Sequence, residues 1–394
     1  MAPMICVYRF VQGLTYDYLF FVILLILSFI LGLLKPKSVN ASHLFIAVLF
    51  CGFLSYVTNT GSIWYSDSLY WHNLVPISIS FFVIMFLIPL IEVGIYKKTL
   101  IVCGIITSVI CIIQILSVVT FGFFVPEMFF PPGLEVTRAL HTISMTRPCS
   151  LFTEPAHFCI FISPIAYLML IDGKKILGFF FIVSMISSTS TTGLLLAGLI
   201  VFAYLCRVRK LSKMFLFGVL AIIAGIIVYA AFPTVIQGSI DKLTNTDADS
   251  DVRLLGPLAY MHLLNTTDII YGIGINQLET FVLKGGGNLA TEGSGNYANA
   301  TLYIFFSYGI IGFITLFSYI LKLWKRSKDK GFLLIFLAIL CSDQILFSSR
   351  FIYLMTFAYL ADQFVKNEEK HVQQNNSYTG GLDSGLSTND GADS

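Results

Sequence analysis

The sequence predicts an all-α polytopic integral membrane protein with about eleven (ten to twelve) transmembrane helices. Two observations lead to this fold class. Of the 394 residues, 56% are hydrophobic and only 12% are charged, and the Lys and Arg residues lie in short clusters between long apolar runs. An apolar run of about 20 residues spans the hydrocarbon core of a bilayer as a helix. This composition excludes an ordinary soluble domain and a disordered chain.

Each predicted span is an apolar run bounded by charged or turn-forming residues. In chain order the spans are 18–34, 42–57, 74–95, 99–124, 155–171, 176–188, 191–206, 214–232, 301–321, 331–347 and 351–365. The sixth and seventh are nearly continuous, but a single helix over both would measure about 46 Å, against a hydrocarbon core of about 30 Å. Lys174 and Lys175 precede this run and Arg207 follows it. A helical hairpin with a Ser/Thr turn at 188–193 keeps both charged ends on one side.

The distribution of the 24 Lys and Arg residues predicts the orientation. Most of them fall on the side of the C-terminus, and those on the other side are Arg9, Arg138, Arg147, Lys242, Arg253, Lys284 and Arg350. Because cytoplasmic loops are enriched in Lys and Arg, we expect a cytoplasmic C-terminus and an N-terminus on the outer side. An interfacial segment within residues 7–14 would change only the N-terminal side. The membrane domain then covers residues 1–365, and residues 366–394 form a polar, disordered cytoplasmic tail.

Two outer loops, 125–154 and 233–300, are much longer than the other connections. Long loops on a rigid helical scaffold usually carry function. The formal charge of +2 does not indicate a basic face, so we expect no nucleic-acid partner. The eight Cys residues form no CxxC pair, and the His residues do not group with carboxylates at ligand spacing. We therefore expect no metal site.

The segment RPCSLFTEPAHF, residues 147–158, combines a cation, a carboxylate and an imidazole where the first long loop returns to the membrane. Pro155 is predicted to begin a helix, because its missing N–H costs nothing at the first helical position. Glu154 and His157 then lie at a helix N-terminus, which favours a bound anion together with Arg147. The alternative is a structural one, in which Arg147 pairs with Glu154 and His157 packs at the membrane interface.

The second long loop contains the segment TDADSDVRLLGPLAYMHLL, in which Arg253 is the single arginine. Apolar residues at helical spacing after Arg253 predict a short helix on the outer face, and His262 belongs to it. The alternative is that Arg253 only neutralises the neighbouring Asp residues. Downstream, Gly272 and Gly274 allow a tight backbone close to a bound group, although a Gly-x-Gly pattern alone is a weak signal.

Together these segments resemble the Wzy-type polymerases of bacterial O-antigen and capsule. The resemblance rests on Arg147, Phe152, Glu154 and Pro155, on the Ser/Thr-Gly turn, on Arg253 and on the segment YGIGINQ with Gly272, Gly274 and Asn276. It implies a metal-independent, GT-C-like glycosyltransferase of the bacterial inner membrane, whose two long loops are periplasmic. It also implies an undecaprenyl-pyrophosphate-linked oligosaccharide as substrate and a chain-length regulator of the polysaccharide co-polymerase type as partner, with no cofactor. About twelve spans are usual in the family, one more than predicted here.

The implied reaction assigns a role to each candidate residue. A hydroxyl group of the incoming unit attacks the anomeric carbon of the growing chain, and lipid pyrophosphate leaves. Arg147 and Arg253 are expected to bind the pyrophosphate, because a guanidinium stays charged and binds phosphate through a fork of N–H groups. Glu154 is the first candidate for the base and His157 the second. Weaker substrate-binding candidates are Gly272, Gly274, Asn276 and His262.

Two other functions are compatible with the same sequence. An O-antigen ligase would use the same donor but transfer the finished chain to lipid A-core. A flippase or transporter for polysaccharide lipids would carry charged residues in the middle of its spans. Here Glu92, Asp172, Asp343 and Asp362 all lie near the ends of spans, so a polymerase is favoured over both alternatives.

Overall fold

The computed structural model describes residues 9–11, 14–33, 42–121, 148–152, 154–208, 255–284 and 298–360. Several predictions fall outside these residues: the span at 214–232, the two arginines Arg147 and Arg253, the tail at 366–394 and most of both long loops.

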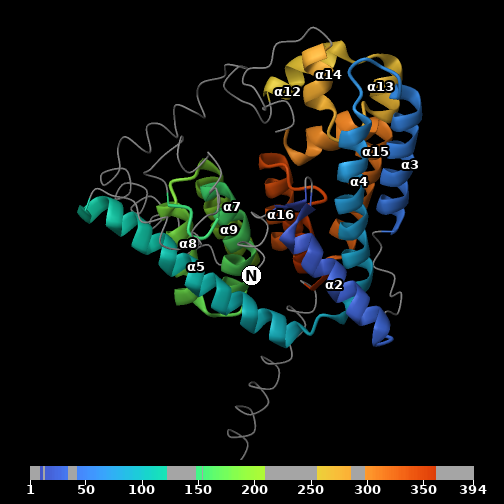
Figure 1. Ribbon diagram of the computed structural model, residues 1–394. Helices are drawn as coiled ribbons and strands as arrows, with labels where there is room; N and C mark the ends of the chain where they lie inside the picture. Colours follow the sequence, from blue (N-terminus) through green and yellow to red (C-terminus); the bar gives the residue numbers. More distant parts are fainter. Residues whose placement is uncertain are drawn as a thin grey trace, which may run out of the picture.

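Helices make up almost all of the described chain (Figure 1). The longer ones are α2 (Tyr16–Ile30), α3 (Ser42–Asn59), α4 (Asp67–Phe82), α5 (Val93–Phe121), α7 (Pro155–Ile171), α8 (Lys175–Ser187), α9 (Thr191–Val208), α15 (Ala300–Arg326), α16 (Lys330–Ser342) and a helix at 349–360. The shorter ones are η1 (Val83–Leu87) and η2 (Ile88–Leu90), which continue α4, and α12 (Leu255–Ala259), η4 (Tyr260–Leu263), α13 (Thr266–Tyr271) and α14 (Leu278–Lys284). Strands β1 (Arg9–Val11) and β2 (Leu14–Thr15) pair antiparallel, a small departure from the all-α prediction.

Three segments are long and apolar enough to cross a membrane: Asp67–Leu90, Val93–Ser117 and Ala300–Arg326. Shorter apolar helices accompany them at Asp17–Ile30, His43–Asn59, Pro155–Ile171, Lys175–Ser187, Thr191–Arg207 and Lys330–Ser342. The chain is thus α-helical with the character of a membrane protein, as the composition indicates. The total of eleven spans stays a prediction.

The ends of four helices test the sequence predictions directly. The hairpin predicted within 176–206 is confirmed: α8 ends at Ser187 and α9 begins at Thr191. Thr189 between them has a φ of 56°, which an α-helix does not allow. Pro155 begins α7, as predicted. The span predicted at 331–347 is too long, because α16 ends at Ser342 and Asp343 is extended, with its carboxylate bound to the next backbone N–H.

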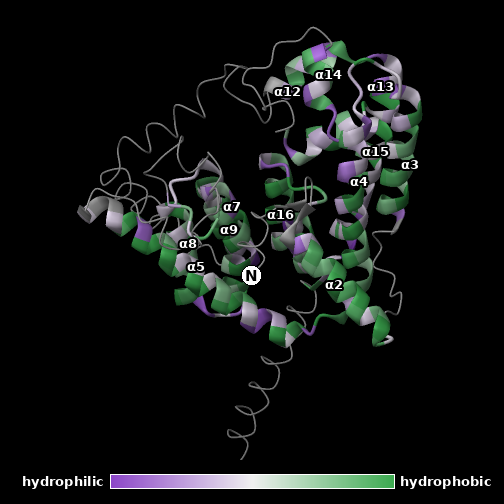
Figure 2. Cartoon of the chain, in the orientation of Figure 1, coloured by the Kyte–Doolittle hydropathy of each residue, from purple (hydrophilic) through white to green (hydrophobic). Residues whose placement is uncertain are grey.

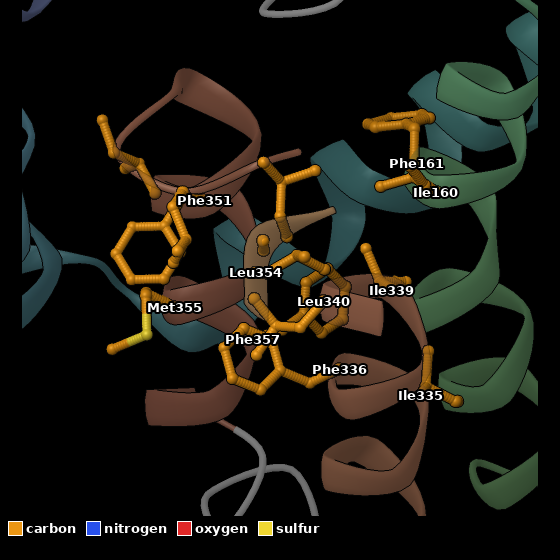
Figure 3. Packing of buried hydrophobic residues seen from close by; sticks show 14 of the residues in the cluster. Ile160, Phe161, Ile335, Phe336, Ile339, Leu340, Phe351, Leu354, Met355 and Phe357 are labelled. Carbon is orange, nitrogen blue, oxygen red and sulfur yellow. The ribbon is translucent and has the colours of Figure 1, made fainter. Parts of the chain in front are cut away.

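Helix packing divides the described chain into two halves joined by α16 (Figure 1). In one half α7 packs against α5, α8 and α9, and every residue from Phe158 to Ile171 is buried. In the other half α15 packs against α3 and α13. Because α16 contacts α7, α9 and α15, its apolar side chains form the shared core with the helix at 349–360. Figure 3 shows Phe336 and Leu340 of α16 beside Leu354 and Phe357 of that last helix.

The helices also expose large apolar side chains. Examples on α2, α3, α5 and α15 are Phe29, Ile30, Ile46, Phe53, Ile106, Leu116, Ile314 and Phe317, and Figure 2 shows apolar residues along most of the length of these helices. Soluble monomers rarely expose contiguous apolar surfaces of this kind. Lipid acyl chains would cover them without the cost of exposing them to water.

Ion pairs gather several of the predicted cytoplasmic clusters at one end of the helices. Lys97 near the start of α5 binds Asp172 at the end of α7, and Asp172 lies 3.5 Å from Lys174 before α8. In the same way Arg207 in the last turn of α9 binds Asp329, the N-cap residue of α16. Since α7 runs from Pro155 to Ile171, its start lies at the opposite end from these pairs.

Candidate functional site

Glu154 and His157 lie at the start of α7, where the sequence places them. Glu154 is the N-cap residue in an extended conformation, and Pro155 follows in the first turn. The Glu154 carboxylate makes no capping hydrogen bond to α7. Instead its Oε2 lies 3.8 Å from Nε2 of His157, with side-chain exposures of 32% for Glu154 and 16% for His157. The carboxylate therefore faces the imidazole.

Asp343 faces the same imidazole from the end of α16. Its Oδ2 lies 3.6 Å from Nε2 of His157 and accepts a hydrogen bond of 3.2 Å from a terminal nitrogen of Arg350. Its Oδ1 accepts a hydrogen bond of 2.8 Å from the backbone N–H of Gln344. The Asp343 side chain is only 8% exposed. The result is a chain of alternating charge-bearing groups, from Glu154 through His157 and Asp343 to Arg350.

Four helix ends meet at this cluster. The backbone N–H of Ala300, the first residue of α15, donates a hydrogen bond of 3.1 Å to the carbonyl oxygen of Asp343. Arg350 lies in the first turn of the helix at 349–360. The starts of α7, α15 and this last helix thus approach the end of α16. Helix starts carry positive partial charge, which favours carboxylates and bound anions at such a junction.

The segment before α7 is fastened to α5 by one buried glutamine. The Oε1 atom of Gln114 accepts hydrogen bonds from the backbone N–H groups of Cys149 (3.1 Å) and Ser150 (2.7 Å), and its Nε2 donates to the carbonyl of Ser150 (3.1 Å). The hydroxyl of Ser150 donates a bond of 2.6 Å to the carbonyl of Thr107. Residues 148–152 are all buried. Since buried backbone N–H and C=O groups need hydrogen-bond partners, Gln114 fixes the chain that leads to Glu154.

The Ser/Thr turn between α8 and α9 packs beside the first half of α7. The Ser188 hydroxyl lies 3.1 Å from Sγ of Cys159 in α7. A Cβ atom added to Gly193 would lie 2.6 Å from the same sulfur, so glycine lets α9 begin close to α7. Among the described residues the buried Thr189 hydroxyl has no hydrogen-bond partner. The turn therefore lies at the same end of α7 as Glu154, as the hairpin prediction requires.

Gly272 packs its backbone against α15. Gly272 has a φ of 86°, and Gly309 interrupts α15 with a φ of 64°. A Cβ atom at Gly309 would lie 2.2 Å from the carbonyl oxygen of Ile270. The N–H of Ile273 donates a hydrogen bond of 2.8 Å to the carbonyl of Phe306, which the break in α15 leaves accessible. Gly272 therefore has a structural role at a crossing of two backbones.

Two of the other weaker candidates, Gly274 and Asn276, follow this crossing closely in the chain, whereas His262 lies on η4. Gly274 and Asn276 both have positive φ values, of 107° and 57°. Next to them Gln277 is fully buried, and its side-chain amide exchanges two hydrogen bonds, of 2.8 and 3.0 Å, with the backbone of Ser66. His262 on η4 is exposed and its Nδ1 lies 2.6 Å from a backbone carbonyl of its own segment. These residues belong to the α15 half of the molecule, whereas Glu154 and His157 belong to α7.

Sequence reasoning missed three residues that build the site. It counted Arg350 only as an outer cation and Asp343 only as a residue near the end of a span, and it gave Gln114 no role. The sequence did carry a signal, because all three are polar residues within apolar stretches. Asp343 and Arg350 stand seven residues apart where two predicted spans meet, and Gln114 stands in the middle of the span predicted at 99–124.

Within the described ranges no group of three or more His, Cys, Asp and Glu side chains is placed to hold a metal ion. Comparisons of the chain with protein-family models, with curated proteins and with solved structures gave no match.

Proposed function

We propose that this protein is a Wzy-type polymerase that joins lipid-linked repeat units of O-antigen or capsule at the periplasmic face of a bacterial inner membrane. The observation that carries the proposal is the convergence of Glu154 and His157 with the Asp343–Arg350 pair where four helix ends meet. In the proposed topology of about eleven spans, the N-terminus and the two long loops are periplasmic and the C-terminus is cytoplasmic. The ion pairs of Lys97 and Arg207 then lie at the cytoplasmic end.

The proposed reaction is a glycosyl transfer between two lipid-linked substrates. The donor is the growing polysaccharide on undecaprenyl pyrophosphate, and the acceptor is the non-reducing-end sugar of a lipid-linked repeat unit. The acceptor oxygen forms a bond to the anomeric carbon, and the bond from that carbon to the pyrophosphate oxygen breaks with its electron pair. The hydroxyl proton moves to Glu154, with His157 as the second candidate, and lipid pyrophosphate departs.

The charges of the described cluster agree with this division of roles. Glu154 and Asp343 carry two negative charges, while Arg350 and a protonated His157 carry at most two positive ones, so the cluster has no excess of cations for a pyrophosphate. In this proposal the additional positive charges that bind the pyrophosphate come from Arg147 and Arg253 of the two periplasmic loops. Fixed cations aimed at the leaving group stabilise the charge that develops on it in the transition state.

The partners follow from the substrates. Both lipid-linked substrates would reach the site from the bilayer. The exposed apolar side chains of the helices are compatible with contact between the protein and lipid chains. A chain-length regulator of the polysaccharide co-polymerase type would act on the same reaction. The proposal includes no metal, cofactor or nucleic acid.

The decisive experiment removes the gene from its host and examines the surface polysaccharide. A polymerase mutant should display chains of a single repeat unit on lipid A-core. Long chains that stay unattached would instead indicate a ligase, and a surface without any repeat unit would indicate a flippase. Purified protein supplied with synthetic lipid-linked repeats should then form a ladder of polymers without any other enzyme.

A further inference from the structure

We propose that Asp343 is a positioning residue that holds the His157 imidazole toward Glu154, and that Arg350 holds the Asp343 side chain in place. The consequence for turnover rests on the proposed polymerase function, whereas the effect on His157 itself does not.

The Asp343 side chain is only 8% exposed, so burying its carboxylate costs desolvation free energy. A buried charge is tolerated only when it is paired and hydrogen-bonded. Arg350 and the N–H of Gln344 supply these partners. Removing either one would leave the carboxylate under-compensated, so Asp343 and Arg350 act as a unit.

The dipole of α16 itself does not stabilise the Asp343 carboxylate. A carboxylate stabilises the N-terminus of a helix and destabilises its C-terminus. Asp329 at the N-cap of α16 follows this rule and accepts a hydrogen bond of 2.8 Å from the N–H of Gly331. Asp343 lies at the C-cap of the same helix, where the dipole opposes it. The groups that favour the carboxylate lie outside α16: Arg350, which donates to its Oδ2 atom, and Nε2 of His157, 3.6 Å from the same oxygen.

The two carboxylates around His157 differ in exposure. Asp343 is 8% exposed and bound by Arg350, whereas Glu154 is 32% exposed. One partner of the imidazole is therefore fixed and the other can reach a ligand. Among the described residues the charged groups that face His157 are Glu154 from α7 and Asp343 from the end of α16, with Arg350 behind Asp343.

The competing explanation is that the Asp343–Arg350 pair only closes the turn between α16 and the next helix. The two charges of the pair act on the imidazole with opposite signs, whereas a pair that served only the turn would leave kcat unchanged when either charge is removed. A negative charge near an imidazole favours its protonated form, and a positive charge disfavours it. Asp343→Asn removes the negative charge and leaves Arg350 unpaired, so the pKa of His157 should fall. Arg350→Gln removes the positive charge, so the pKa of His157 should rise.

The test is a titration of the full-length protein in lipid nanodiscs, with isotope-labelled histidine observed by NMR and the His157 signal assigned with His157→Asn. We expect a decrease of about one pKa unit or more in Asp343→Asn and an increase in Arg350→Gln. The matched control is Asp329→Asn, which neutralises a comparably buried, arginine-paired carboxylate at the other end of α16 and should leave His157 unchanged. Equal His157 titrations in the wild type and both site variants would overturn the proposal. If Asp343→Asn does not fold, Arg350→Gln alone decides by its sign.

A second readout connects the inference to catalysis. With purified protein and synthetic lipid-linked repeats, Asp343→Asn should lower kcat at least ten-fold with little change in donor KM, and Arg350→Lys should restore more activity than Arg350→Gln. A kcat and a pH profile equal to those of the wild type would contradict the positioning role. If the wild type itself forms no polymer, the proposed function has failed, and the NMR titration still decides whether Asp343 acts on His157.

Discussion

Asp329 and Asp343 lie at the two ends of α16, and each carboxylate is bound by an arginine from outside that helix. Asp329 also accepts a hydrogen bond of 2.8 Å from the Tyr167 hydroxyl, and it lies among the Lys and Arg clusters at one end of the molecule. Asp343 instead faces His157 at the other end. One short helix thus separates a carboxylate that binds Arg207 and Tyr167 from a carboxylate that faces the His157 imidazole.

The first prediction concerns topology. Because the ion pairs of Lys97 and Arg207 place several Lys and Arg clusters at one end, and such clusters stay in the cytoplasm, a reporter fused after Lys330 should be cytoplasmic. One fused near Asn288 should be periplasmic. Alkaline phosphatase and green fluorescent protein fusions at both positions measure this. A reversed result at either position would also remove the periplasmic assignment of Glu154.

The second prediction concerns the two loop arginines. Arg147→Ala and Arg253→Ala should each abolish polymerisation while the protein still inserts into the membrane. Lys at either position should restore only part of the activity, because an ammonium cannot bind phosphate bidentately. Surface polysaccharide ladders and immunoblots of membranes are the measurements. Normal polymer from Arg253→Ala would leave this arginine with only its local role, the neutralisation of Asp249 and Asp251.

The third prediction separates two roles of Glu154. If Glu154 is the base, Glu154→Gln keeps the shape of the side chain but cannot accept a proton, and turnover should fall by about 10²-fold or more with donor affinity retained. If Glu154 only pairs with a cation, the loss should be about 0–1 kcal/mol and turnover should change by a few-fold. Turnover and donor affinity are measured together on the purified protein.

Glu92→Gln is the matched control for this experiment, since Glu92 is an exposed carboxylate before α5, and it should retain wild-type turnover. If donor affinity weakens together with turnover in Glu154→Gln, the carboxylate orients a phosphate-binding group. Near-normal turnover would transfer the role of base to His157.

The fourth prediction concerns the backbone crossing at Gly309. Gly309→Ala forces a side chain into positive φ and within 2.2 Å of a carbonyl oxygen, so it should destabilise the protein by about 1–3 kcal/mol or more. Gly198→Ala in α9 is the control, because a Cβ atom there meets nothing within 4 Å, and it should be neutral or stabilising by about 0.5–1 kcal/mol. Thermal unfolding in detergent measures both. Equal stabilities of the two variants would show that the chains do not cross at Gly309.

The fifth prediction concerns Asp268, the acidic residue of the capping box of α13. Burial raises the pKa of the Asp268 carboxyl above its usual value, so the folded protein binds this proton more tightly than the unfolded chain. The associated stability is present below the unfolded pKa of about 4 and is lost as the pH rises through the folded pKa. Asp268→Asn should therefore gain stability relative to the wild type between pH 4 and pH 7. A stability difference that does not change with pH would contradict this.

The hydrophobicity of each apolar run, together with the charged or turn-forming residues that bound it, was sufficient to predict most of the described helices. Pro155 marked the start of α7, and the length limit of a membrane span predicted the break between α8 and α9. Both follow from local physics: the missing N–H of proline and the thickness of a bilayer. The prediction that the span at 331–347 continues past Asp343 was wrong, because apolar residues at 345–347 continue the hydropathy pattern after the helix has ended.

By itself the sequence determined that the chain is helical and apolar and that Glu154 and His157 share one helix start, since these properties depend on residues close together in the chain. Only the tertiary structure decided that Asp343 faces His157 and that Gln114 holds the segment before α7. These contacts join residues 186 and about 36 positions apart, and which helix ends meet depends on how side chains of many helices pack. The same reason separates Gly272 from the candidate site: its positive φ is a local property, but the partner that needs it is the broken backbone of α15.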